Sequence, residues 1–177
     1  VDSSLTAAGT LNVNAAATVT FGGDFTVATL NVNAATTFMQ GASSFTITKA
    51  ANLTASASFT GSGALNVAAM TINSNSVLTL SVDATKTTAL VSTLTVNNSA
   101  ASATAFLGGR LTGDKTLTLT KGILELNGAT LALTGTVSGS GSIADTPETG
   151  ALIINSTISL PTATIGNLTV ASGKTVT

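Results

Sequence analysis

Seven carboxylate side chains are the residues of this chain that could carry acid–base chemistry. Hydrolysis of a polysaccharide needs two such groups at a fixed separation, or a metal ion beside a base. The acids are instead scattered, and we interpret the one dense group of charges as solvated surface charge with weak ion pairs. We predict that the protein is not an enzyme, and polysaccharide cleavage stays as a minor alternative. The acids are Asp2, Asp24, Asp83, Asp114, Glu125, Asp145 and Glu148, and the dense group is Arg110, Asp114, Lys115, Lys121 and Glu125.

Histidine and cysteine are absent from the sequence. Their absence excludes Ser-His-Asp and Cys-His nucleophile arrangements, and also zinc sites built from His or Cys. No Asp-rich EF-hand loop and no Gly-Gly-x-Gly-x-Asp repeat marks a calcium site. The glycine-rich segment 138–142 (SGSGS) lacks the Lys-Thr or Lys-Ser that follows in a phosphate-binding loop, so we interpret it as a corner. We therefore expect no cofactor and no bound metal, and a calcium ion held by Asp and backbone carbonyls stays as a minor alternative.

Threonine pairs with one residue between them are the remaining candidates for surface chemistry. A flat rank of such pairs could order water, and an ice-binding surface would need one pair in every turn of a repeating fold. The pairs begin at residues 18, 46, 85, 93, 116, 134, 162 and 175, which are irregular steps. We interpret these threonines as outward, β-branched strand residues, with ice binding as a minor alternative.

The composition favours thin, closely spaced layers. Apolar residues make up 44% of the 177-residue chain, yet only 3% are aromatic, all of them Phe, and 7% are charged. Ordinary globular proteins carry roughly 25% charged residues. The net charge of −1 gives no electrostatic reason to expect a nucleic acid partner. No run of about 18 apolar residues occurs, so we expect no transmembrane helix.

Apolar and polar residues alternate with the period of a β-strand, and the alternating segments repeat. The segment 10–16 (TLNVNAA) recurs as 29–35, an offset of 19 residues. The strand-like triplets 25–27, 45–47 and 65–67 step by 20 residues. A shorter beat of seven residues runs through the second half, in the pairs Leu117/Leu119, Leu124/Leu126 and Leu131/Leu133.

These periods predict an all-β fold: a single right-handed parallel β-helix, or β-solenoid, over residues 1–177. Each turn of such a fold has two or three flat faces, and three faces of about seven residues give coils of roughly 20 residues. The chain would then hold about nine coils and form a rod roughly 40 Å long at a strand spacing of about 4.8 Å. Right-handedness is expected because crossovers between parallel strands are almost always right-handed. Glycines would turn the corners, and Asn12/Asn31 and Asn14/Asn33 would form ladders.

Part of the sequence resembles a known kind of repeat. The segments 117–135 (LTLTKGILELNGATLALTG), 136–143 (TVSGSGSI) and 166–170 (GNLTV) look like repeat regions of very large bacterial surface and secreted β-solenoid proteins of the adhesin type. The resemblance is best over residues 110–177 and looser before. It implies export, a parallel β-helix and a role at the cell surface, and it brings no catalytic residues.

The two ends of the sequence suggest end-to-end continuity. Thr175-Val176-Thr177 would continue into Val1-Asp2 as one alternating strand, and no capping helix or charged terminal coil is visible at either end. A solenoid with bare ends exposes unpaired strand edges, which proteins normally cover. We therefore predict that the end coils associate with another copy, or with the next unit of a tandem repeat. The residues that we assign to this self-association are Val1, Leu5, Leu11, Val13, Leu168, Val170 and Val176.

The function predicted from these observations is that of a structural subunit or repeat unit of an extracellular fibre, sheath or stalk. The alternative is a rod segment of a cell-surface adhesin that contacts a host, a cell or a polysaccharide. Saccharide binding usually uses aromatic platforms, and neither Trp nor Tyr is present, which weighs against that alternative.

Overall fold

The computed structural model describes residues 4–73, 77–81, 89–97, 104–108, 110–126, 128, 130–146 and 148–177, and every regular element in these residues is a β-strand. The strands form two sheets, here called sheet A and sheet B, in which all pairings are parallel. Sheet A contains β1 (Leu5–Val13), β3 (Phe25–Val32), β5 (Phe45–Leu53), β7 (Leu65–Asn73), β9 (Ala89–Asn97), β11 (Arg110–Lys121), β13 (Thr130–Leu133), β16 (Ala151–Ile154) and β18 (Asn167–Val170) in this order, and β14 (Thr136–Gly139) pairs with β11. Sheet B contains β2 (Ala17–Thr20), β4 (Thr36–Gly41), β6 (Ala57–Gly61), β8 (Val77–Ser81), β10 (Thr104–Gly108), β12 (Ile123–Glu125), β15 (Ser142–Ala144) and β17 (Ala163–Thr164).

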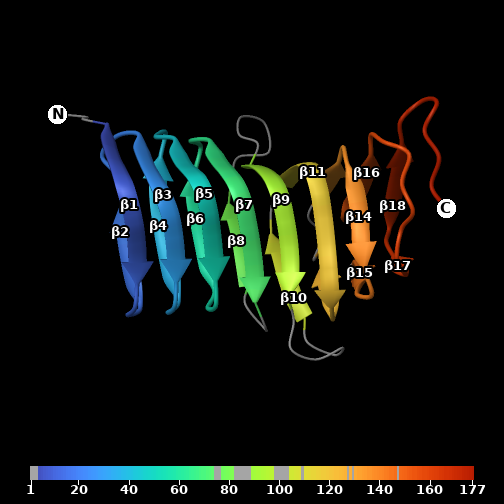
Figure 1. Ribbon diagram of the computed structural model, residues 1–177, viewed down its shortest axis with the longest axis horizontal. Helices are drawn as coiled ribbons and strands as arrows, with labels where there is room; N and C mark the ends of the chain where they lie inside the picture. Colours follow the sequence, from blue (N-terminus) through green and yellow to red (C-terminus); the bar gives the residue numbers. More distant parts are fainter. Residues whose placement is uncertain are drawn as a thin grey trace.

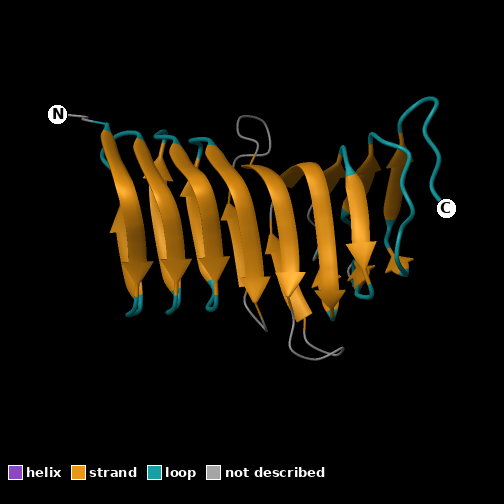
Figure 2. Cartoon of the chain, in the orientation of Figure 1, coloured by secondary structure: helices purple, strands orange, loops and turns teal. Residues whose placement is uncertain are grey.

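The chain winds through the two sheets as a β-solenoid. Successive strands alternate between sheet A and sheet B through β12, and each strand pairs with the strand one turn away in the sequence. The two termini lie at opposite ends of the long axis (Figure 1). Figure 2 shows strands and loops and no helix over the described residues. The predicted all-β parallel solenoid is therefore confirmed.

The number of regular turns is smaller than the predicted number of coils. The solenoid has about six turns with a long strand in sheet A, up to β12, rather than about nine. The short strands β13, β16 and β18 extend sheet A beyond these turns. Through β12 each turn has a long strand of 8 to 12 residues in sheet A and a shorter strand in sheet B. Beyond β12 the strands shorten to between two and four residues, although they still add to the same two sheets. Pro161 lies in this part, just before β17, and it favours a short strand there because proline cannot donate a backbone hydrogen bond to a strand ladder.

The strand register confirms the repeats seen in the sequence. Thr10 lies opposite Thr29, an offset of 19 residues, and Phe25 lies opposite Phe45, an offset of 20. Irregularities in the register divide each long strand of sheet A into two halves, for example between Ala7 and Thr10. We call the first halves face 1, the second halves face 2, and sheet B face 3. The solenoid thus has two sheets but three faces in each regular turn.

The seven-residue beat marks successive faces of one turn. Leu117 lies on face 2, Leu124 on face 3 and Leu131 on face 1, and all three side chains are buried. Inward side chains of this kind stack into columns along the axis, and the columns form one apolar core. Burying each such side chain stabilises the fold by about 1.5–3 kcal/mol.

Asparagine ladders run along the outside of face 2. Asn31 donates from Nδ2 to Oδ1 of Asn12 over 2.8 Å, and Asn52 donates in the same way to Asn31 over 2.8 Å. Asn33 donates to Asn14 over 2.8 Å, so both predicted ladders are confirmed. Each amide is at once a donor and an acceptor, which lets identical side chains one turn apart satisfy one another.

Candidate functional site at the ends of the solenoid

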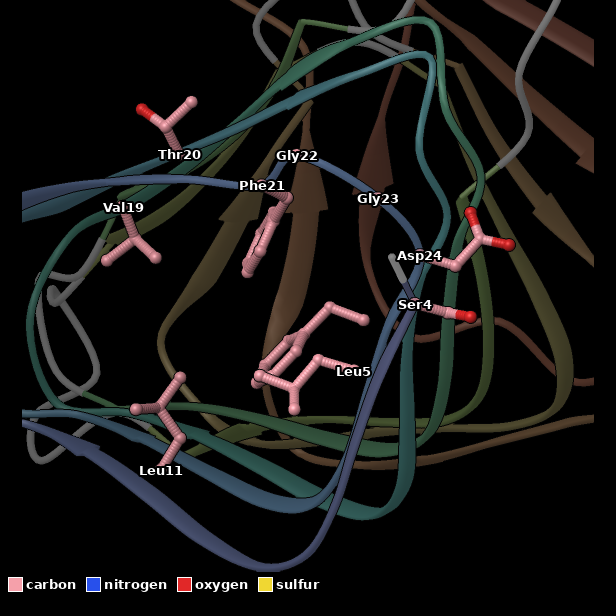
Figure 3. Close-up of a pocket in the computed structure, with 10 residues that line it drawn as sticks. Ser4, Leu5, Leu11, Val19, Thr20, Phe21, Gly22, Gly23 and Asp24 are labelled. Atoms are coloured by element: carbon pink, nitrogen blue, oxygen red, sulfur yellow. The ribbon is translucent and has the colours of Figure 1, made fainter. Parts of the chain in front are cut away.

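The N-terminal end of the solenoid is an open, apolar mouth. Leu5, at the start of β1, is 61% exposed, and Leu11, Val19 and Phe25 behind it are only partly buried. These side chains surround a cavity of about 450 Å³. Figure 3 views this cavity, with Leu5, Leu11, Val19 and Phe21 directed toward its interior. They occupy the inward positions that the core residues occupy in the following turns, so the mouth is an uncovered cross-section of the core.

An aromatic cluster forms the floor of this mouth. The ring of Phe21 stacks on that of Phe25, with centroids 5.0 Å apart, and on that of Phe38 at 6.3 Å. Phe38 stacks in turn on Phe59 at 4.9 Å, and Phe45 is tilted against its neighbours. Five of the six phenylalanines of the chain thus gather in the first three turns. This cluster was not predicted from the sequence, although the 20-residue step from Phe25 to Phe45 was a signal for it.

The C-terminal end is also apolar and uncovered. Leu168 and Val170 on β18 are 48% and 38% exposed. Their partners one turn inward, Leu152 and Ile154, are fully buried. Val176 forms an isolated parallel bridge with Ile158 and is partly buried. A further turn beyond β18 would bury Leu168 and Val170 in the same way that β18 buries Leu152 and Ile154.

The residues that we predicted for self-association lie mainly at these two ends. Leu5, Leu168 and Val170 are exposed there, Leu11 and Val176 are partly buried, and Val13 is buried in the first turn. Val1 lies outside the described residues. Among the described side chains, the exposed large apolar residues are Leu5, Met39, Leu168 and Val170, so three of the four lie at an end.

The outer strands leave their backbone edges open to pairing. β1 and β18 stand at the two ends of sheet A, and β2 and β17 stand at the two ends of sheet B. Neither β1 (LTAAGTLNV) nor β18 (NLTV) contains a charged residue or a proline. Charges and prolines are the usual means by which an edge strand is kept from pairing with another chain.

Two carboxylates, Glu125 and Asp145, are buried near the end of sheet B, and both serve as hydrogen-bond acceptors. Asp145 accepts from the backbone N–H of Gly128 over 2.9 Å and of Gly150 over 2.7 Å. Glu125 accepts from the N–H and the hydroxyl of Thr146 over 2.7 and 2.8 Å. These contacts anchor the loop after β15 to the preceding turn. Within the described part of the chain no three acidic residues gather as a metal site.

The other charges of the dense group cannot be placed beside Glu125. The side chains of Arg110, Asp114, Lys115 and Lys121 lie outside the described part of the structure. The hydrogen bonds of Glu125 and Asp145 support a structural role for these two carboxylates, because backbone N–H groups and a hydroxyl donate to their oxygen atoms.

Hydroxyl groups line the outside of face 3. Thr18, Thr37 and Ser58 lie in one row of paired positions, and Thr20 begins a second row that continues through Met39. Among the first three turns, only the first carries a Thr-x-Thr pair on face 3, because Met39 in the second turn and Ser58 in the third stand at the paired positions. Met39 is 46% exposed and interrupts the array.

Comparison of the chain with known protein families, with curated proteins and with solved structures found no match. No helix that could cross a lipid bilayer occurs in the residues covered by the structure.

Proposed function

We propose that this chain is a structural rod whose two open ends are extended by further solenoid turns, as a subunit or repeat unit of an extracellular fibre, sheath or stalk. The observation that carries the proposal is the pair of apolar end surfaces, with Leu5 at one end and Leu168 and Val170 at the other. Each end surface repeats the inward pattern of the interior turns, so another turn of the same kind would cover it.

The energetics favour covering both ends. Leu5, Leu168 and Val170 are each substantially exposed, and fully burying such a side chain contributes about 1.5–3 kcal/mol. A solenoid is stabilised by contacts between neighbouring turns, so a terminal turn has half of the contacts of an interior turn. Whether the next turn belongs to another copy or to the same polypeptide, it supplies the missing half.

The location outside the cell rests on the sequence. The resemblance of residues 110–177 to repeat regions of exported bacterial β-solenoids supports it. Only six residues are Lys or Arg, which leaves few sites for trypsin-like proteases and suits an exposed fibre.

Electron microscopy of the purified chain at neutral pH, before and after a strong denaturant, tests the proposal. We expect uniform thin fibres with an axial repeat of about 40 Å, because sheet A stacks nine strands from β1 to β18 at a spacing of about 4.8 Å. Fibres that dissolve into 177-residue chains would have non-covalent joints. Dispersed chains at all concentrations, with no tendency to lengthen, would contradict end-to-end assembly.

A second candidate, a surface-binding rod of the adhesin kind, is favoured by the row of hydroxyls on face 3. Thr18, Thr37 and Ser58 present these groups in register. Replacing all three by Lys would abolish binding to a polysaccharide-coated or cell surface on this reading, while fibre formation would be unaffected. Binding that survives the replacement would exclude face 3 as the contact surface.

A further inference from the structure

We infer that two copies of this chain dock head to tail in one register, in which β1 of one copy pairs in parallel with β18 of the other and Leu5 lies on Leu168. This inference rests on the proposed function and adds to it the partner, a second copy, and the residues that meet. It follows from the columns of inward residues on face 1.

The first column joins Leu5 to Leu168 through the whole molecule. The paired positions lead without a break from one residue to the other, and no register irregularity falls on face 1 between them. The column is Leu5, Phe25, Phe45, Leu65, Ala89, Leu111, Leu131, Leu152 and Leu168. Leu5 and Leu168 are therefore the two open ends of a single stack.

Two parallel sets of paired positions fix the same register. One begins at Ala7 and ends at Val170, and the set between it and the first column begins at Thr6 and ends at Thr169. A head-to-tail contact that continues all three places Ala7 on Val170 and Thr6 beside Thr169. On face 2, Leu11 begins a column that runs as far as Val137.

Other registers are unfavourable. A shift of one residue would bring Leu168 beside Thr6 and turn its side chain away from the core, because alternate residues of a strand face opposite sides. A shift of two residues would bring Leu168 onto Ala7 and move Val170 past the end of face 1, where the register of β1 is irregular. Only the continued register buries Leu5, Leu168 and Val170 together.

A second copy is the occupant that fits because the interior of the molecule already contains the same contact. Every interior turn pairs with the next in parallel, with the same inward columns, and the edge of β1 is complementary to the edge of β18 for this kind of pairing. The contact is made on sheet A, since sheet B ends one turn earlier, at β17, in the described residues.

Cysteine pairing between copies tests the register. The chain has no cysteine, and Thr6 and Thr169 are both exposed, so Thr6→Cys and Thr169→Cys can be made as separate proteins. In the inferred register their Cα atoms would lie about 5 Å apart, within the roughly 4.4–6.8 Å that a disulfide spans. Mild oxidation of the mixture should give a covalent dimer that neither protein gives alone.

A matched control uses a neighbouring exposed position on β18. With Asn167→Cys in place of Thr169→Cys, the Cα atoms would lie about 8 Å apart, beyond the span of a disulfide. No dimer should form with Thr6→Cys. Circular dichroism of each variant, compared with that of the unmodified chain, establishes that the variants are folded.

The outcomes separate the register from the proposed function. Cross-linking of the 6/167 pair, or of Thr169→Cys with itself, while the unmodified chain still forms fibres, would overturn the register and leave end-to-end assembly standing. An unmodified chain that sediments as a monomer at every concentration would overturn both. Dimers of the 6/169 pair alone would establish the head-to-tail contact.

Discussion

At the scale of single residues, the polar groups of this chain serve the solenoid itself. The buried Asp145 accepts two backbone N–H bonds, one from Gly128 in the preceding turn and one from Gly150 in its own loop. Hydrogen bonds to an ionised acceptor contribute about 1.5–3 kcal/mol each. Without them the N–H of the buried Gly150 would be left unpaired, and unpaired buried donors destabilise a fold. Asp145 therefore holds together the part of the chain where regular turns end.

The substitution Asp145→Asn should lower the free energy of unfolding by about 2 kcal/mol, because the amide nitrogen would face an N–H donor and the remaining oxygen would be uncharged. Chemical denaturation measures the change. Asp24→Asn is the matched control: Asp24 is exposed and accepts one bond, from the N–H of Ser44, so we expect a loss of less than about 1 kcal/mol. Equal losses for the two variants would contradict an anchoring role for Asp145.

At the scale of elements, the close approach of successive turns governs what the corners accept. Gly139 ends β14 with a φ of 104°, a conformation that residues with a side chain rarely adopt. A Cβ atom there would collide with the backbone carbonyl of Leu119 in the preceding turn. Corner glycines of this kind are needed both for their backbone conformation and for the spacing between turns.

Gly139→Ala should destabilise the chain by about 2–3 kcal/mol, from backbone strain and the collision with Leu119 together. Gly22→Ala is the control, since Gly22 is exposed and an added Cβ would meet nothing within 4 Å. For that variant we expect a change within about 0.5 kcal/mol. Urea unfolding of both proteins gives the comparison, and a tolerated alanine at 139 would show that the two turns can separate at little cost.

At the scale of the whole molecule, stability is distributed along columns and is lowest at their ends. Leu65 is fully buried and Leu5 is 61% exposed, although both belong to the same column on face 1. Contacts between neighbouring turns contribute most of the stability of a solenoid, so the same side chain contributes more to the free energy of unfolding in the middle than at the end.

Leu65→Ala should cost about 3 kcal/mol in the dispersed chain, whereas Leu5→Ala should cost less than about 1 kcal/mol there. For assembly, Leu5→Ala should have the larger effect of the two variants. It should raise the concentration at which fibres form, because it removes part of the end contact. Denaturation and light scattering measure the two effects. If Leu5→Ala left assembly unchanged, the N-terminal mouth would not be part of the joint.

Much of the fold could be predicted because repeats place equivalent residues in register. Two segments of the same seven residues, at 10–16 and 29–35, were enough to predict that Asn12 lies beside Asn31. The Phe cluster and the row of Thr18, Thr37 and Ser58 escaped prediction, because they join residues of different faces or different types. The number of regular turns was overestimated because the strands become short beyond β12, although sheet A continues there through β13, β16 and β18.

The sequence by itself determined the class of fold, the period of the turns and the identity of the ladders, because alternation and spacing depend only on local strand geometry and on one repeat length. Only the tertiary structure decided which side chains stay uncovered. Leu5 and Leu168 have the same chemistry as Leu65 and Leu152 in their column, yet the first two are exposed and the others are buried. The difference is physical: burial of a strand residue in a solenoid requires a turn on each side, and the terminal turns have a neighbour on one side only.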